Sequence, residues 1–146
     1  MKLPEYITIE EVQKVCKAIE LSDWTKKTEP IVSEEEASTI LNIVNTKSME
    51  IPLEDFRKGL EVELEHGTRF EDANVTNNHP ILTGKIVIAH LKETMDYYSR
   101  IDVAEIEGDL LKAVLSRNID KIESKYKKLL EAQNILNQAV LKQLKQ

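Results

Sequence analysis

The scarcity of turn-forming residues is the feature that most restricts how this chain can fold. Only four of its 146 residues are glycine, whereas charged residues make up 32% and apolar residues 41%. A many-stranded fold needs more turn residues than this, so a glycine-poor chain rich in Lys, Glu, Leu and Ile favours helices. We therefore expect an all-α helical bundle, and the length suits a single domain over residues 1–146.

Start signals and apolar spacings predict five to six helices. Thr8 and Ser33 each open a capping box, a pattern in which the first side chain accepts a hydrogen bond from the first helical turn. Pro52 suits the first turn of a third helix, and Gly67 suits the position just beyond its end. Residues 80–100 are the most apolar helical segment, so we expect them to form the most buried element.

Residues 102–146 are predicted to form the C-terminal helices. A third capping box at Asp102 opens one helix, and the chain then either turns at residues 117–118 or continues without a break. Apolar residues from Ile119 to Val140 recur at helical spacing and predict a long amphipathic helix of about 25 residues. Such a helix can cover the bundle or pair with its counterpart in a second subunit, so a homo-oligomer is the partner hypothesis.

Composition argues against several classes of protein. The net charge of −6 disfavours a general nucleic-acid binder, although residues 119–146 carry six lysines against three acidic residues. The single cysteine, Cys16, excludes an internal disulfide. The sequence shows neither a leader nor a run of about 18 apolar residues, so we expect no membrane contact and a cytoplasmic location.

The three histidines, His66, His79 and His90, are close together in the sequence. Two of them lie three residues from a glutamate, in the pairs Glu63/His66 and His90/Glu93, and this spacing puts both members of a pair on one helical face. His79 precedes a proline and is expected to lie at the start of the helix over residues 80–100. Any chemistry of this chain is therefore expected between residues 63 and 97.

Three interpretations of the histidine–glutamate pairs remain open. The pairs can form a hydrogen-bonded cluster that fixes the register of two helices without a ligand. They can instead bind a metal ion, because mixed imidazole and carboxylate ligation suits zinc, non-haem iron or manganese. Metal-free acid–base chemistry by a histidine beside a carboxylate is the third interpretation. The metal ligands would be Glu63, His66, His90 and Glu93, with Tyr97 hydrogen-bonded behind them.

The metal interpretation requires that the two helices are offset along their axes. His90 lies about ten residues into its helix, roughly 15 Å from its start, whereas His66 lies at the end of the preceding helix. The loop over residues 68–78 must span that offset. If the two helices instead begin level, His79 becomes the closer neighbour of His66.

Two segments resemble a small uncharacterised family of microbial and phage proteins. Residues 59–67 read Gly-Leu-Glu-Val-Glu-Leu-Glu-His-Gly, and residues 90–98 read His-Leu-Lys-Glu-Thr-Met-Asp-Tyr-Tyr. Both are similar to signatures of that family, in which proline is frequent at the position of Met95. The likeness covers residues 50–101 well and residues 8–24 more loosely. No activity is attached to the family, so the resemblance implies only that residues 50–101 form a unit, a core helical hairpin.

Two functions of different class follow from the sequence. The first is a small helical metal-binding protein with its His/Glu site between two helices. The second is a non-enzymatic interaction module, in which the C-terminal helix mediates self-association or partner binding and the His/Glu cluster is structural. No nucleophile, phosphate loop or cofactor fingerprint accompanies the histidines, so no reaction is assigned.

Overall fold

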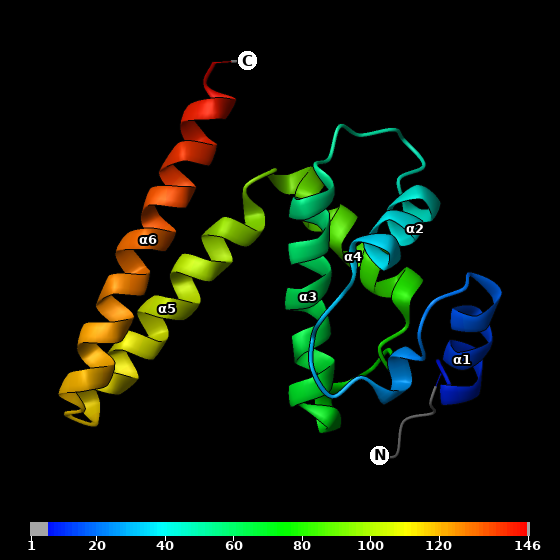
Figure 1. The fold of residues 1–146 in the computed structure, drawn as a ribbon, viewed down its shortest axis with the longest axis horizontal. Coiled ribbons are helices and arrows are strands. Elements are labelled where there is room, and N and C mark those ends of the chain that lie inside the picture. Colours follow the sequence, from blue (N-terminus) through cyan, green and yellow to red (C-terminus); the bar gives the residue numbers. More distant parts are fainter. Residues whose placement is uncertain (1–5, 146) are drawn as a thin grey trace. The chain divides into compact units, whose positions relative to one another are not determined.

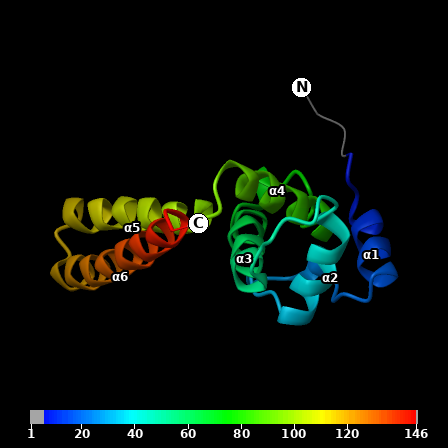
Figure 2. The ribbon, with the colours of Figure 1, turned by 90° about the horizontal axis from the view of Figure 1, so that it is seen from above.

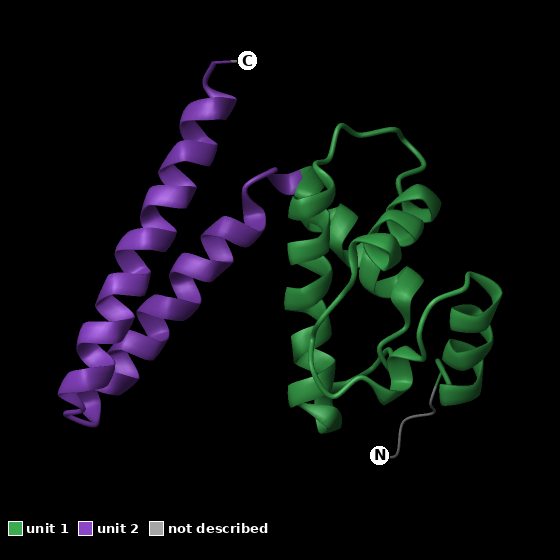
Figure 3. Cartoon of the chain, viewed as in Figure 1, with its two compact units in different colours: residues 1–92 green, residues 93–146 purple. Residues whose placement is uncertain are grey.

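The computed structural model describes residues 6–145, and every regular element in that range is helical (Figure 1). The predicted all-α fold with a long C-terminal helix is therefore confirmed. The chain divides into two compact units, residues 1–92 and residues 93–146 (Figure 3). A single domain over residues 1–146 stays a prediction. The elements in chain order are α1 (Ile9–Ala18), η1 (Trp24–Lys26), α2 (Glu34–Val44), α3 (Leu53–Arg69), η2 (Glu71–Ala73), α4 (Pro80–Glu93), α5 (Tyr97–Leu115) and α6 (Ile119–Gln143).

The first two α-helices begin where the capping boxes predict. The Thr8 hydroxyl accepts a hydrogen bond from the Glu11 amide at 3.2 Å at the start of α1. At the start of α2, Ser33 and Glu36 form both hydrogen bonds of a capping box. Local sequence signals thus determine these two helix starts.

The core of the first unit lies between α2, α3 and α4. Gly84 brings α4 close to α2, because a Cβ atom at this position would lie 2.5 Å from Cγ2 of Ile40. A larger side chain would therefore force the two helices apart. The largest fully buried side chains include those of Trp24, Ile40, Phe56, Leu60 and Leu64.

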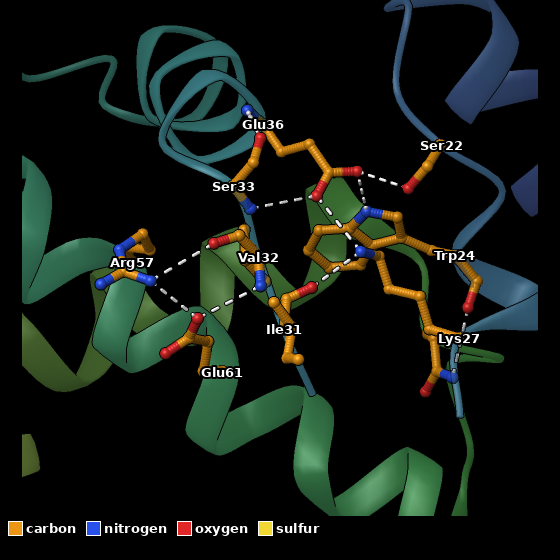
Figure 4. Close-up of polar contacts among 10 residues, drawn as sticks. Ser22, Trp24, Lys27, Ile31, Val32, Ser33, Glu36, Arg57 and Glu61 are labelled. Carbon is orange, nitrogen blue, oxygen red and sulfur yellow. Dashed lines mark hydrogen bonds and ion pairs between the residues drawn. The ribbon is translucent and has the colours of Figure 1, made fainter. Parts of the chain in front are cut away.

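The carboxylate of Glu36 connects α2 to the irregular segment before it (Figure 4). It accepts hydrogen bonds from the Ser22 hydroxyl and, at 3.0 Å, from Nε1 of Trp24. The Lys27 ammonium forms an ion pair with it at 3.2 Å, and both of these side chains are mostly buried. Burial raises the pKa of Glu36, but the hydrogen bonds from Ser22 and Trp24 and the charge of Lys27 outweigh that effect, so the pKa lies below its ordinary value.

A second polar contact joins the same segment to α3. The Val32 amide donates to the Glu61 carboxylate at 3.2 Å, and the Arg57 guanidinium donates to the Val32 carbonyl at 3.4 Å. Arg57 and Glu61 also form an ion pair at 2.9 Å. The backbone before α2 is therefore fixed on both sides although it has no regular structure (Figure 4).

Two predicted boundaries around Gly67 and residue 100 are wrong. Helix α3 continues through Gly67 to Arg69, and glycine is needed there because a Cβ atom would lie 1.9 Å from Oδ1 of Asn78. The predicted helix over residues 80–100 ends at Glu93, and a new helix begins at Tyr97. The glycine therefore permits a close contact with a loop and does not end the helix.

The break between α4 and α5 contains a buried carboxylate, Asp96. The Arg100 guanidinium donates two hydrogen bonds to it at 2.9 and 2.8 Å, and the Thr94 hydroxyl donates a further one. The Asp96 side chain is only 1% exposed. Because α5 already starts after Asp96, the predicted helix start at Asp102 is also wrong: Asp102 lies inside α5.

The second unit is an antiparallel hairpin of α5 and α6, which lie side by side in both views (Figures 1 and 2). The chain turns at Arg117, whose φ of 52° is left-handed, and the Asn118 side chain caps α6 by accepting from the Lys121 amide at 3.0 Å. No described helix combines the length and the apolar content that crossing a bilayer requires. The buried apolar residues of this unit are Tyr98, Ala113, Leu129 and Ala132.

Replacement of Glu36 should destabilise the first unit. Glu36→Gln keeps the shape of the side chain but removes the charge that faces Lys27, so we expect the free energy of unfolding to fall by about 2 kcal/mol. Fluorescence of Trp24, the only tryptophan, follows unfolding of this unit during urea denaturation. Glu35→Gln removes the same charge from the neighbouring, exposed position of the same helical turn and should leave the free energy of unfolding nearly unchanged. Equal losses in the two variants would contradict the role assigned to Glu36.

Candidate functional site

The candidate site begins with Glu63 on α3. Phe56 and Leu60 of this helix are fully buried, and Glu63 follows them on the same helical face. Its side chain is therefore only 13% exposed. A carboxylate in such a place needs a polar or charged partner to offset its lost hydration.

His90 of α4 supplies a partner for Glu63. Nδ1 of His90 lies 3.0 Å from Oε1 of Glu63, and the His90 side chain is 27% exposed. The two helices are therefore offset so that the last part of α4 meets the last part of α3, as the metal interpretation requires. The contact therefore links Glu63 of one predicted pair to His90 of the other, across the two helices.

His66 lies on the other side of the same carboxylate. Its Nδ1 atom is 3.8 Å from Oε2 of Glu63, beyond the length of a hydrogen bond, and its side chain is 61% exposed. Glu63 thus lies between two imidazoles, one close and partly buried, the other looser and open to solvent.

Glu93 and Tyr97 are separated by the break between α4 and α5. Glu93 is the last residue of α4 and is exposed, whereas Tyr97 is the first residue of α5. The helix predicted over residues 80–100 is interrupted there, so Tyr97 does not continue the helical face that His90 and Glu93 share. Tyr97 makes an edge-to-face ring contact with Tyr98, with the ring centroids 5.2 Å apart.

The arrangement as it stands is that of a carboxylate–imidazole pair. Across residues 6–145, no three His, Cys, Asp or Glu side chains are placed so that they could hold a metal ion. A neutral imidazole that donates from Nδ1 to Glu63 has Nε2 as its acceptor nitrogen. The same orientation by a carboxylate is typical of histidines that bind metals. The geometry suits either a structural hydrogen bond or a histidine that Glu63 orients for metal binding.

His79 takes no part in this pair and caps α4, as expected from its place before Pro80. Its Nδ1 atom accepts hydrogen bonds from the amides of Ile81 and Leu82 at 3.2 and 3.4 Å. Burial lowers the pKa of His79, against a smaller raising effect from its own backbone. The imidazole is thus held in the neutral form, the only form in which Nδ1 can accept.

A cluster in the second unit was not predicted from the sequence. Lys112, Lys121 and Lys125 surround a pocket near the turn of the α5–α6 hairpin, together with Asp109. The available signal was the four-residue spacing of Lys121 and Lys125, which places both on one helical face. The partner residues on α5 could not be inferred without the structure.

The His79 cap predicts a pH-dependent stability. Because its pKa is lowered on folding, the cap stabilises the protein fully above the unfolded pKa of about 6.5, and this contribution is lost as the pH falls below that value. The free energy of unfolding, followed by Trp24 fluorescence, should therefore fall between about pH 7.5 and 5.5. His79→Asn keeps a capping oxygen without the titration, so its decrease should be smaller.

His66→Asn serves as the matched control for His79→Asn, because His66 is exposed and caps no helix. It should retain the pH dependence of the unchanged protein. Identical pH profiles for His79→Asn and the unchanged protein would show that the His79 cap does not cause the effect.

Comparison with known proteins places the chain in a family without assigning an activity. No curated protein and no solved structure was found to match it. A family model described as "Protein of unknown function (DUF5661)" matches residues 12–107, which include α4 and both histidine–glutamate pairs. The predicted resemblance to an uncharacterised family is thus confirmed, over a longer segment than residues 50–101. Since the match covers more than half of the sequence, this chain belongs to the DUF5661 family of unknown function.

Proposed function

We propose that the chain is a helical interaction module whose α5–α6 hairpin pairs with the hairpin of a second copy. The supporting observation is an apolar face on the hairpin, formed by residues that are about half exposed or more. On α6 they recur at intervals of 7, 4, 11 and 3 residues, which keeps them on one side of the helix. The apolar face consists of Ile119, Tyr126, Leu130 and Leu141 of α6, Leu144 directly after it, and Val114 of α5.

Both helices contribute residues of the apolar face, and these residues lie on the same side of the hairpin. The pocket near the turn identifies one side, because Lys112 of α5 and Lys121 of α6 both line it. Relative to the helix–helix contact, Val114 and Leu130 lie on the other side of their helices, since each residue advances the helix by about 100°. The apolar face therefore extends over both helices.

The apolar face is large enough for a dimer. Its six side chains expose roughly 100 Å² each, and with half-buried neighbours such as Val103 and Ile122 the face offers on the order of 800 Å² per chain, the area per partner of a standard interface. Two helices alone bury few apolar residues, whereas four helices enclose a core. Pairing two hairpins would therefore complete a four-helix bundle.

The charges of the hairpin favour a second copy over other partners. Residues 93–146 carry nine basic and nine acidic residues, so the hairpins of two copies do not repel each other by net charge. Helix α5 has four acidic and two basic residues, whereas α6 has five lysines and three acidic residues. In a two-fold arrangement α5 of each copy can face α6 of the other, which places opposite charges together.

Sedimentation velocity over a range of protein concentrations tests this proposal. The unchanged chain should form a dimer, and Leu130→Glu should raise the dimer dissociation constant on the order of 100-fold, because the interface would bury a carboxylate. Leu130 is 52% exposed, so the substitution costs the single chain little.

Ile135→Glu provides the matched control for Leu130→Glu. Ile135 is 54% exposed on the same helix but lies away from the apolar face, so this variant should dimerise like the unchanged chain. A chain that stays monomeric at every concentration, or equal effects of the two substitutions, would contradict the proposal.

The contact between Glu63 and His90 supports a second candidate function, binding of a divalent metal ion. In that proposal His66, His90 and Glu93 are ligands, and Glu63 either orients His90 or joins the ligands after a side-chain rotation. Such mixed nitrogen and oxygen ligation suits zinc, with iron or manganese as alternatives. Two of these residues, His66 and Glu93, are exposed, so their side chains can move to a metal without opening the core.

Calorimetric titration with zinc tests the metal proposal. One ion should bind per chain, and His90→Ala should weaken binding by a factor of ten or more, which is on the order of the losses seen when groups around a metal are removed. His79→Asn removes a histidine outside the site and should leave the zinc affinity unchanged. Absence of zinc binding, or equal affinities for His90→Ala and the unchanged chain, would refute a site at these residues.

A further inference from the structure

The α5–α6 hairpin contains a basic pocket on the side opposite to the apolar face. The pocket has a volume of about 430 Å³ and lies within the second unit, near the turn between the helices. A volume of this size suits a small molecule. Its polar lining residues are Asp109, Lys112, Ser116, Lys121, Ser124 and Lys125.

Asp109 positions two of the three lysines. Its Oδ1 atom lies 3.1 Å from the Lys112 ammonium, and its Oδ2 atom lies 2.6 Å from the Lys125 ammonium. Hydrogen bonds from these lysines lower the pKa of Asp109 to about 2. The carboxylate is therefore ionised at neutral pH and holds a lysine from each helix at the pocket.

The charges around the pocket do not balance. Asp109 offsets one of the three ammonium charges, and among the described residues no carboxylate forms an ion pair with Lys121. The α6 N-terminus, capped by Asn118, adds the positive end of a helix dipole beside Lys121. The lining residues therefore carry a net charge of about +2, and Asp120 in the first turn of α6 is not among them.

Hydroxyl groups complete the lining between the lysines. The Ser116 hydroxyl on the turn donates to the Ala113 carbonyl, so it can donate to a ligand only after it rotates away from that carbonyl. Ser124 lies one residue before Lys125, and its hydroxyl can act as a donor. Ammonium and hydroxyl donors around one space suit an oxyanion better than an apolar ligand.

We propose that this pocket binds a phosphate dianion, either free phosphate or the phosphate group of a small monoester. A phosphate group carries a charge close to −2 at neutral pH and offers three or more acceptor oxygens, which matches the excess charge and the donors. The site lies on the side of the hairpin that the proposed dimer leaves open, so it does not depend on dimer formation.

An NMR titration of the full-length chain tests the pocket. Inorganic phosphate and phenyl phosphate are added in separate series at constant ionic strength, and amide chemical shifts are followed. Saturable shifts should concentrate in residues 109–125 in at least one series. Tighter binding of phenyl phosphate would identify a monoester as the ligand class, and tighter binding of inorganic phosphate would identify the free ion; both support the site.

Lysine substitutions distinguish specific phosphate binding in the pocket from nonspecific electrostatic attraction of phosphate to a basic helix. Lys121→Gln should raise the dissociation constant about tenfold, which corresponds to the loss of one charge-assisted contact. Lys142→Gln removes the same charge from α6 far from the pocket in the sequence and should leave the constant unchanged. Shifts that do not saturate, or equal effects of the two substitutions, would overturn the proposal.

Discussion

Two α-helices cannot enclose a hydrophobic core, and this constraint determines how the chain uses its apolar residues. The first unit has four α-helices and fully buries large side chains such as Trp24 and Phe56. The second unit has only α5 and α6, so its apolar residues are divided between the contact of the two helices and the surface. The six residues of the apolar face lie on one side of the hairpin, and the lysines of the pocket lie on the other. A second copy of the hairpin would supply the missing layer.

Partly buried carboxylates fix the parts of the fold that hydrophobic contacts leave undetermined. Glu36 orders the irregular backbone before α2, Glu63 connects α3 to α4, and Asp96 fixes the start of α5. Each would be unfavourable without partners, because a carboxylate loses hydration when it is buried. Each of these three carboxylates has polar or charged partners, and an arrangement of the helices that separated them would be unfavourable. The site of the candidate metal ion is one of these contacts, which is why structural and metal-binding roles for Glu63 share the same geometry.

Local sequence signals predicted the helical fold, the starts of α1 and α2, and the long last helix. They failed where a distant residue decides the outcome. Gly67 looked like a helix end, but its function is to admit Asn78. Residues 94–96 also look helical, yet α4 ends at Glu93, and Asp96 lies buried in the break with Thr94 and Arg100 as its partners. The sequence made Glu63 and His90 candidate site residues but left open whether they meet, because the offset of α3 and α4 depends on the packing of the loop between them.

The central claim, that the hairpin completes its core with a second copy, is tested most directly by native-state hydrogen exchange as a function of protein concentration. Exchange of an amide slows when its helix is stabilised by association. We predict that amides of α5 and α6 become more protected as the concentration rises, whereas amides in the core of α2 and α3 keep the same protection. Protection of α5 and α6 that is independent of concentration would contradict the claim.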